Sequence, residues 1–293
     1  MPPSEVLIGA DPEFFLYSYA NEYDHDEGEE GYIPCVGIVP GTKENPHQLG
    51  VPGFFAHEDN VALEVGIPPV ANPLKFADNI AKVKKMVADQ FLNDMHVELV
   101  YQSAVQFRPE QLESQQAQQF GCEPDYDAYT NGKVRTVPTK FGDDQLRFAG
   151  GHIHIGGNFN CPPFVAALFA DVFIAMPNLV RQQPYYAGLQ QGRGNWYGKP
   201  GIFRPKPYGI EYRTPSNFWC QNHDLSAQIG EQALRLGRYL CDNNATTLRQ
   251  AVQAIDWLAV QTMLSDTGPN SKDRKEKALI LLDALSNAVG LGL

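Results

Sequence analysis

Four short segments of the 293-residue chain each place polar or ionisable side chains two or four residues apart, with apolar residues between them. These side chains are Asp11 and Glu13, Asn60 and Glu64, His152 and His154, and Glu211 and Arg213. Successive side chains of a β-strand point to opposite faces, so each segment as a strand has one apolar and one polar face. Carboxylates are uncommon in strands, because a half-buried pleated surface does not suit them. We therefore predict four strands whose polar faces form one chemical site.

A divalent cation is the chemistry that this set of donors predicts. Several carboxylates and two imidazoles would repel or desolvate one another unless a cation lay among them. Carboxylate oxygens with one nitrogen are typical of magnesium or manganese, whereas zinc prefers more histidine or cysteine. Two histidines and one carboxylate, here His152, His154 and an acid, are also typical of a zinc or iron hydrolase or oxygenase. That enzyme class stays open as an alternative.

A second informative segment, Tyr185–Gly209, has a positive net charge, whereas the net charge of the whole chain is negative. It contains several glycines and no acid, and its cationic residues are Arg193, Lys199, Arg204 and Lys206. We predict a basic loop, with Gln190–Pro207 closing over phosphate oxygens. The chain has no Walker-type phosphate loop, so metals and arginines would hold any nucleotide.

Four motifs in a fixed order carry a resemblance to a known family. They are GADPEF at residues 9–14, DNVALE at 59–64, GGHIHIG at 150–156 and YGIEYR at 208–213. Together they resemble the phage-encoded carboxylate–amine ligases, or amidoligases, which are related to glutamine synthetase and glutamate–cysteine ligase. The resemblance spans roughly residues 8–213. The chain is much shorter than glutamine synthetase, and it has no recognisable separate N-terminal domain.

The resemblance implies a role for each matching residue. The metal ligands would be Glu13, Glu64, His152 and Glu211. His154 would lie beside the nucleotide, Arg213 would contact phosphate or the transition state, and Arg204 would be a further phosphate-binding arginine. Lys199 and Lys206 of the basic segment would also contact the nucleotide.

The resemblance also implies a reaction that uses ATP and magnesium or manganese. A carboxylate donor would attack the γ-phosphoryl group, and an amine acceptor would attack the resulting acyl phosphate to form an amide or isopeptide bond. Asp125, in an acidic segment with Glu123 and Asp127, is the candidate to accept the proton of the amine. The sequence does not identify the donor or the acceptor. A non-catalytic protein that keeps a ligase-like sheet is a third alternative.

The elements that position these residues are expected to form one α+β domain over residues 1–293. We predict a mainly antiparallel, curved sheet backed by helices, as in the catalytic domain of glutamine synthetase. Residues 8–213 would carry the motifs and residues 224–293 would form a helical scaffold. The predicted helices are a segment that starts at Asn72-Pro73, then Pro163–Gln182, Asp224–Cys241, Thr247–Leu264 and Ser271–Val289. The predicted strands are Glu5–Ile8, Glu13–Tyr19, Val61–Gly66, His96–Gln106, Arg147–Gly157 and Gly209–Arg213.

Composition limits the partners and the compartment. The net charge of −11 disfavours general binding to nucleic acid. The longest apolar run, Phe164–Met176, is too short to span a bilayer and contains Asp171, and no leader opens the chain. The five cysteines show no close pairing and are expected to be free thiols. We expect a cytoplasmic protein without a membrane partner, in the host cytoplasm if phage-encoded, and leave a homo-oligomer open.

Overall fold

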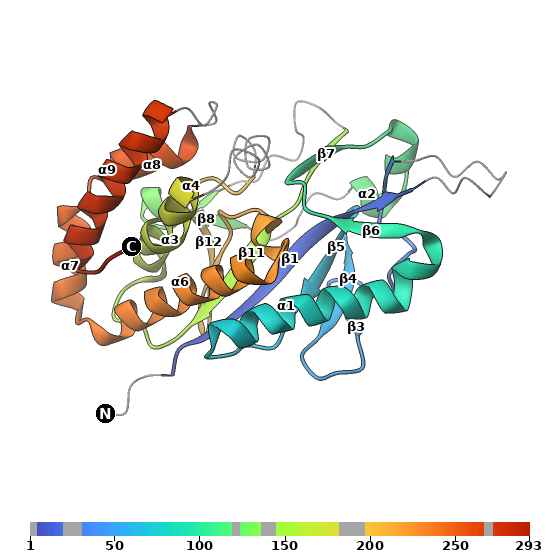
Figure 1. The fold of residues 1–293 in the computed structure, drawn as a ribbon, viewed down its shortest axis with the longest axis horizontal. Helices are drawn as coiled ribbons and strands as arrows, with labels where there is room; N and C mark the ends of the chain where they lie inside the picture. The colour runs from blue at the N-terminus through green and yellow to red at the C-terminus, as the bar shows by residue number, and fades with distance from the viewer. Residues whose placement is uncertain (1–4, 20–30, 119–123, 136–144, 182–196, 267–271) are drawn as a thin grey trace.

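A computed structural model describes residues 5–19, 31–118, 124–135, 145–181, 197–266 and 272–293 (Figure 1). Every pairing among its described strands is antiparallel, and helices cover the sheet, so the predicted α+β class is confirmed. The main path of the large sheet runs β3-β4-β5-β1-β11-β13-β12-β8-β9, and β2 and β6 also pair with β1. The bounds of its strands are β1 (Leu7–Ser18), β2 (Gly31–Ile33), β3 (His47–Gln48), β4 (Phe55–Asp59), β5 (Ala62–Gly66), β6 (Val97–Val100), β8 (Asp125–Asp127), β9 (Lys133–Arg135), β11 (Gly151–Gly156), β12 (Ile202–Lys206) and β13 (Gly209–Tyr212).

The four motif segments are neighbours in this sheet. Strand β1 is its centre, and it pairs with β11 and with β5. Asp11 stands opposite His152, and Glu13 stands opposite Glu64. On the next strand, β13, Glu211 stands opposite His154 of β11. The predicted convergence of the four strands is therefore confirmed.

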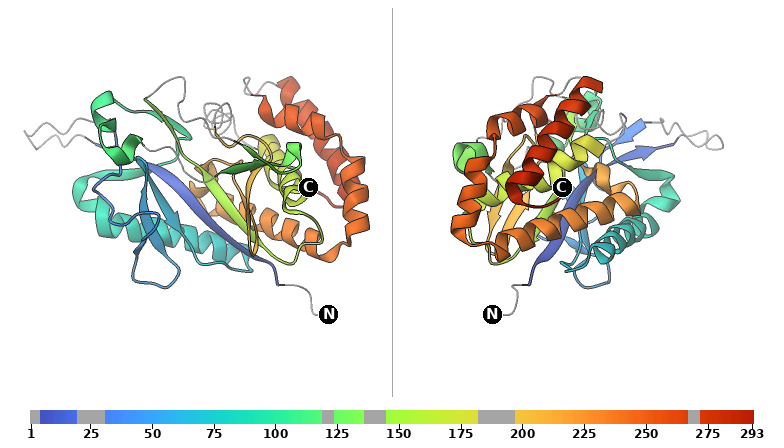
Figure 2. Two further views of the ribbon diagram at one scale, coloured as in Figure 1. Left: turned by 180° about the vertical axis from the view of Figure 1, so that it is seen from behind. Right: turned by 60° about the vertical axis from the view of Figure 1, so that its left-hand side comes forward.

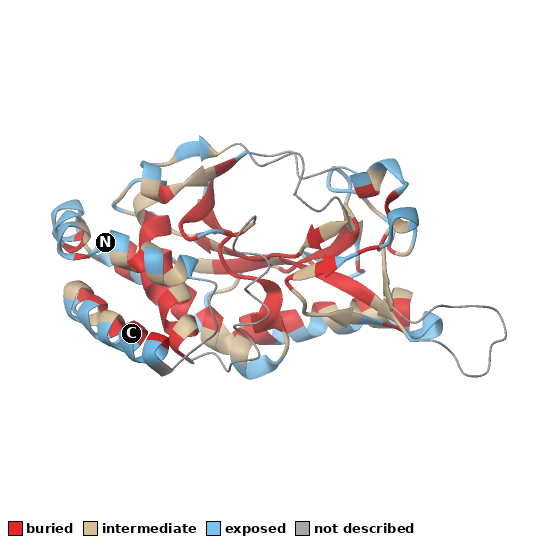
Figure 3. Ribbon diagram, turned by 90° about the horizontal axis from the view of Figure 1, so that it is seen from above, coloured by how far each residue is buried: buried red, intermediate tan, exposed pale blue. Residues whose placement is uncertain are grey.

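Helices α1 (Pro73–Val87) and α6 (His223–Asp242) lie side by side along one face of the sheet (Figure 1). Asn72 begins α1 as predicted, because its Oδ1 accepts a hydrogen bond from the backbone N–H of Lys75 at 2.9 Å. Alternate residues of the central strands are buried on the helix side of the sheet: Ile8, Ala10, Ile153, Ile155, Ile210 and Tyr212. The polar motif residues thus occupy the other face. Figure 3 shows that buried residues are concentrated in the middle of the molecule, where the central strands lie.

The C-terminal helices gather at one end of the molecule (Figure 2). They are α7 (Ala245–Ala254), α8 (Trp257–Ser265) and α9 (Lys272–Val289). The predicted helix Thr247–Leu264 is wrong as a single element. The chain breaks it at Ile255, and Asp256 begins α8 by accepting a hydrogen bond from the backbone N–H of Ala259.

One helical run crosses the core and contains a π-helical turn. It consists of α3 (Pro163–Ala170), η5 (Asp171–Ala175) and α4 (Met176–Arg181). Residues 163–180 are long and apolar enough to cross a membrane by composition, but 72% of this window is buried inside the protein. The run therefore has the burial of a core helix.

Four predicted strands differ from the structure. Glu5–Ile8 and Glu13–Tyr19 are one continuous strand, β1, since Gly9 to Pro12 pair with β11. His96–Gln106 and Arg147–Gly157 are each broken. Their parts β7 (Ala104–Gln106) and β10 (Leu146–Phe148) form a separate two-stranded sheet. The remaining short helical segments are η1 (Ala88–Leu92), η2 (Asn93–Met95), η3 (Pro109–Leu112), α2 (Gln115–Gln118), η4 (Ala128–Thr130) and η6 (Asn217–Cys220).

The predicted basic loop is corrected over its described part. Arg204 and Lys206 lie on β12, which pairs with β13 on one side and β8 on the other. Residues 182–196, including Arg193, lie outside the described residues. The acidic segment that holds Asp125 is also a strand, β8, and Glu123 lies outside the described residues. Both segments contain prolines and many charged residues, which obscure the polar–apolar alternation that predicts a strand.

Gly151 is predicted to be a position where a methyl group destabilises the fold. A Cβ there would overlap the carbonyl oxygen of Ser216 and lie 2.5 Å from Nε1 of Trp219. We expect Gly151→Ala to lower the free energy of unfolding by about 1–3 kcal/mol, as overpacking does. Gly9→Ala is the matched control in β1, because a Cβ there meets no atom closer than 3.8 Å. Thermal and urea unfolding measure the stability of both variants. Equal stability of the two would contradict the predicted steric clash at Gly151.

Candidate active site

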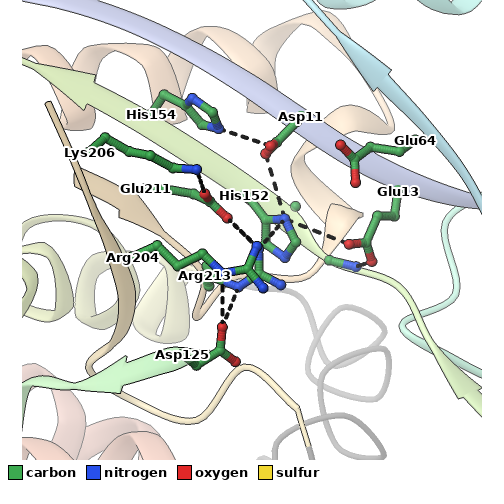
Figure 4. Close-up of polar contacts among 12 residues, drawn as sticks. Asp11, Glu13, Glu64, Asp125, His152, His154, Arg204, Lys206, Glu211 and Arg213 are labelled. Carbon is green, nitrogen blue, oxygen red and sulfur yellow. Dashed lines mark hydrogen bonds and ion pairs between the residues drawn. The ribbon is translucent and has the colours of Figure 1, made fainter. Parts of the chain in front are cut away.

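The polar face of the sheet holds a cavity of about 160 Å³ at the centre of the motif strands. Figure 4 shows side chains from β1, β5, β8, β11, β12 and β13 pointing toward one another. The charged residues that line the cavity are Asp11, Glu13, Lys43, Asp59, Glu64, Asp125, Arg147, Arg204, Lys206, Glu211 and Arg213. Acids and bases from distant parts of the chain therefore share one small space.

Three carboxylates form a first group of convergent donors. Glu13, Asp59 and Glu64 each offer an oxygen, and these oxygens lie within 4.8 Å of one another. Burial, together with the charges of Asp59 and Glu64, raises the pKa of Glu13 to about 8 against the opposing effect of Arg213. Burial likewise raises the pKa of Glu64 to about 7. Ionising the whole group therefore costs free energy without a cation.

His57 of β4 contacts this group from the side. Its Nε2 lies 3.2 Å from Oε1 of Glu64, and its ring is 2% exposed. Burial is the largest single effect and opposes its charge, but the hydrogen bond and charge of Glu64, with the Glu58 carbonyl and the charge of Asp59, together raise the pKa of His57 to about 9. The sequence analysis missed both His57 and Asp59. The alternation of Phe55, His57 and Asp59 before a turn at Asn60 was the available signal, and Asn60 itself has a φ of 62° in that turn, not in a strand.

A second group of convergent donors includes Asp11, which lies two residues before Glu13 on β1. An oxygen of Asp11, a nitrogen of His154 and an oxygen of Glu211 lie within 4.8 Å of one another. Nε2 of His154 lies 3.0 Å from Oδ2 of Asp11, and Nδ1 of His154 lies 2.6 Å from the hydroxyl of Tyr208. Burial opposes ionisation of Asp11, but His154 and His152 together hold its pKa well below the usual range.

His152 occupies the space between the two groups. Its Nδ1 lies 3.6 Å from Oδ1 of Asp11 and 3.7 Å from Oε1 of Glu13, and it accepts a hydrogen bond from Arg213 at 3.2 Å. Its Nε2 lies 3.0 Å from the hydroxyl of Tyr197. Burial and the charge of Arg213 lower the pKa of His152 to about 3, so the ring is neutral at pH 7. Its ligand role stays a prediction, because the Nδ1 lone pair that would bind a cation accepts the hydrogen bond from Arg213.

Glu211 is the carboxylate that pairs with the basic side chains on one side of the cavity. Its carboxylate pairs with Arg213, with Nζ of Lys206 at 2.7 Å and with NH1 of Arg204 at 3.5 Å. Burial and Asp11 oppose ionisation of Glu211, but Arg213, His152 and Arg204 outweigh them and lower its pKa to about 2. Both predicted arginines and Lys206 therefore meet the predicted ligand Glu211.

Asp125 lies beneath the two arginines. Its Oδ1 is 3.3 Å from Nε of Arg204 and 3.1 Å from Nε of Arg213, and the residue is 2% exposed. The structure brings Asp125 into the site, where it is a counter-ion of both guanidinium groups. Its proposed role as proton acceptor stays a prediction. Lys199 differs, because its side chain is exposed and does not line the cavity.

A buried carboxylate on the helix side of the sheet ties the cationic strands together. Asp171 accepts hydrogen bonds from the hydroxyls of Tyr212 on β13 and Tyr129 on η4, at 2.5 and 2.8 Å. The backbone N–H of Gly201, next to β12, also bonds to it. Burial raises the pKa of Asp171 to about 7 against these hydrogen bonds. One side chain in the π-helical turn thus fixes segments that carry Asp125, Arg204, Glu211 and Arg213.

A second, larger cavity of about 540 Å³ adjoins the first at Asp11. It lies beyond His154 and Tyr208, toward the end of β11. Most of its lining is apolar or glycine: Leu7, Gly9, Ala10, Phe55, Gly66, Ile67, Pro69, Gly156, Gly157, Pro207 and Tyr208. Its size is typical of a pocket for a small organic molecule.

Comparison with known proteins shows that part of the chain is similar to a family of carboxylate–amine ligases. Residues 144–255 match the model of the family described as phage phiEco32-like COOH.NH2 ligase-type 2. This match supports the family resemblance predicted from the four motifs, two of which lie inside the matched range. The matched range contains His152, His154, Arg204, Glu211 and Arg213, whereas β1, β4 and β5 precede it. The comparison with curated proteins gave no match.

The pKa shifts predict that the metal-free protein loses stability as the pH rises from 6.5 to 8. Glu13, Glu64 and His57 all have folded pKa values above their ordinary values, so each binds more protons in the folded chain across this window. Deprotonation of Glu13 alone corresponds to about 1–2 kcal/mol over the window. Unfolding in EDTA at both pH values measures the loss.

Glu13→Gln is the variant that tests this assignment. It removes the titrating group with little change of shape, so we expect a smaller loss of stability between pH 6.5 and 8 than in the wild type. Glu98→Gln on β6 is the control, since Glu98 lies outside the cavity lining. If Glu13→Gln showed the full wild-type pH dependence, the raised pKa of Glu13 would be wrong.

Proposed function

We propose that the protein is an ATP-dependent carboxylate–amine ligase that uses magnesium or manganese and forms an amide or isopeptide bond. One observation carries this proposal: carboxylates of two groups of convergent donors and five cationic side chains line one cavity. Asp11 and Glu13 are two residues apart on one strand face, or roughly 7 Å. Cations bound beside these two residues would both contact the phosphates of one nucleotide.

The residues present fit divalent cations. Glu13, Asp59 and Glu64 would hold one ion, and Asp11, His154 and Glu211 would hold another, with His152 facing both groups. Oδ1 of Asp11 is buried and has no hydrogen-bond partner among the described residues. Oxygen donors with one imidazole suit magnesium and manganese. Bound cations would neutralise the triphosphate and polarise its terminal phosphoryl group.

The cationic strands would contact the transferred phosphoryl group. Arg204, Lys206 and Arg213 already point into the cavity, where Glu211 and Asp125 hold them (Figure 4). Their positions are fixed by a sheet and not by a loop, so little reorganisation is needed when negative charge develops on phosphate oxygens. Arg213 is the best placed of the three, because it also contacts His152 and Tyr197.

The second cavity would hold the nucleoside. It adjoins the proposed phosphate site at Asp11, and its lining offers apolar contacts and the ring of Tyr208, which stacks on His154 at 5.9 Å. An adenine ring suits such a surface, whereas a carboxylate does not. The donor and acceptor would then occupy the end of the first cavity near Glu13, Lys43 and Arg147.

The chemistry would proceed in two displacements. An oxygen of the donor carboxylate attacks the γ-phosphorus, and ADP leaves. The amine nitrogen then attacks the acyl carbon, phosphate leaves, and the nitrogen loses a proton, for which Asp125 is the candidate acceptor. Water must be kept from the acyl phosphate. Such a ligase would act in the cytoplasm, of the host cell if phage-encoded.

The arrangement favours the ligase over a zinc or iron hydrolase or oxygenase. Each group of convergent donors found in the described part of the chain contains at most one histidine. His152 and His154 therefore do not meet around one point with a carboxylate. The basic side chains of the cavity also suit the binding of phosphate oxygens, which the ligase reaction requires.

ADP release in the presence of magnesium tests the proposal. Purified protein is incubated with ATP and a panel of carboxylates and amines, and products are identified by mass spectrometry. We expect Glu211→Gln to lower turnover at least 1,000-fold, because it removes a cation ligand and the counter-ion of three basic side chains. Glu98→Gln should retain activity. Wild-type turnover by folded Glu211→Gln protein, judged by circular dichroism, would exclude the assigned role.

Narrowing the second cavity tests the nucleoside assignment. Asn158 is exposed and lines this cavity, so Asn158→Trp fills it without touching a charged group of the first cavity. We expect the KM for ATP to rise about tenfold with little change in kcat, since the interaction lost is made equally before and during reaction. Asn158→Ser is the matched control. An unchanged KM in the tryptophan variant would place the nucleoside elsewhere.

A further inference from the structure

His57 holds one oxygen of Glu64 through a contact across two paired strands. The residues stand directly opposite each other in the β4–β5 pair, and Nε2 of His57 lies 3.2 Å from Oε1 of Glu64. The ring stacks on Phe55, with centroids 6.1 Å apart and planes 5° apart. Both His57 and Glu64 are buried. The imidazole therefore has a fixed position and a fixed orientation.

The second nitrogen of the ring shows which atoms carry hydrogen. Nδ1 of His57 lies 3.0 Å from the carbonyl oxygen of Glu58. A carbonyl oxygen only accepts hydrogen bonds, so Nδ1 is a donor. When Glu64 is ionised, as a cation ligand must be, Nε2 beside its oxygen is a donor as well. His57 is then a double donor that keeps Oε1 of Glu64 engaged.

A carboxylate with one engaged oxygen favours binding a cation through the other oxygen alone. Glu64 would then contribute Oε2 to the cation that it shares with Glu13 and Asp59. Calcium accepts bidentate carboxylates and six to eight oxygen ligands, whereas magnesium requires a near-octahedral set of single donors. Holding Oε1 thus disfavours the larger ion, although both ions prefer oxygen.

We propose that His57 is a positioning residue that makes the Glu13–Asp59–Glu64 site select magnesium or manganese over calcium. This inference rests on the proposed cation site and adds its selectivity and the residue that sets it. No family feature identified in the sequence includes His57. The selectivity follows from the contact of His57 with a ligand oxygen, not from a contact with the cation.

Binding of metal alone tests the inference without turnover. Metal-free protein is titrated with Mn²⁺, free Mn²⁺ is measured by electron paramagnetic resonance, and Mg²⁺ and Ca²⁺ are compared as competitors. The wild type should prefer Mg²⁺ over Ca²⁺ at least tenfold at the site that Glu64→Gln weakens. In His57→Phe, which keeps a ring against Phe55 and removes both donors, the preference should fall to within threefold.

Two matched variants separate the hydrogen bond from general damage. His57→Gln keeps an N–H donor for Oε1, so we expect most of the magnesium preference to return. His47→Gln changes another histidine of the same sheet, on β3, that does not line the cavity, and it should behave as the wild type. Circular dichroism and thermal unfolding confirm that each variant is folded.

The outcomes distinguish this inference from the proposed function. Wild-type protein that binds no Mn²⁺ overturns both. Tight Mn²⁺ binding with equal competition by Ca²⁺ and Mg²⁺ in the wild type overturns the selectivity alone, even if His57→Phe does not fold. Folded His57→Phe with the full wild-type preference overturns the role of His57 and leaves the ligase proposal intact.

Discussion

The site depends on a buried concentration of like charge that the backbone itself imposes. Antiparallel register places Glu13 opposite Glu64, and strand alternation puts Asp11 on the same face as Glu13. These carboxylates cannot move apart without breaking the pairing of the central strand. Compensation must therefore come from neighbouring groups, and His57, Arg213 and a divalent cation are the candidates that the surroundings offer. The raised pKa values of Glu13 and Glu64 express the part that remains uncompensated.

Sequence patterns predicted the part of the site that follows strict alternation. Motif residues on β1, β5, β11 and β13 could be assigned to one face because an apolar neighbour separates each pair of polar groups. The helices with clear caps or long apolar faces, such as α1 after Asn72, were also predictable. Here local chemistry and tertiary structure agree, which is why period-two reasoning reached the ligand groups.

The remainder depends on contacts that no single segment encodes. His57 and Asp59 lie on a short strand whose partner is known only from the fold. In β12, Pro205 interrupts the sequence pattern that would predict a strand. Asp171 is more instructive. In sequence it is a single carboxylate within an apolar helical run. Its burial is explained only by the hydrogen bonds from the hydroxyls of Tyr129 and Tyr212. Buried polar residues of this kind are satisfied by long-range partners, so their purpose is not readable from neighbours in sequence.

The position of β1 has a consequence for how the molecule is made. Its flanking partners are β5, which follows soon along the chain, and β11, which ends at Gly156; β13 then completes the acidic and basic walls. During synthesis the first half of β1, residues 7–12, therefore stays without β11 until more than half of the polypeptide has left the ribosome. The end of the strand pairs with β6, which is made earlier. Pairing over such long sequence separations is slow to form, and an open edge invites association with other chains. Chaperone protection of the nascent N-terminal half would relieve this exposure until β11 arrives.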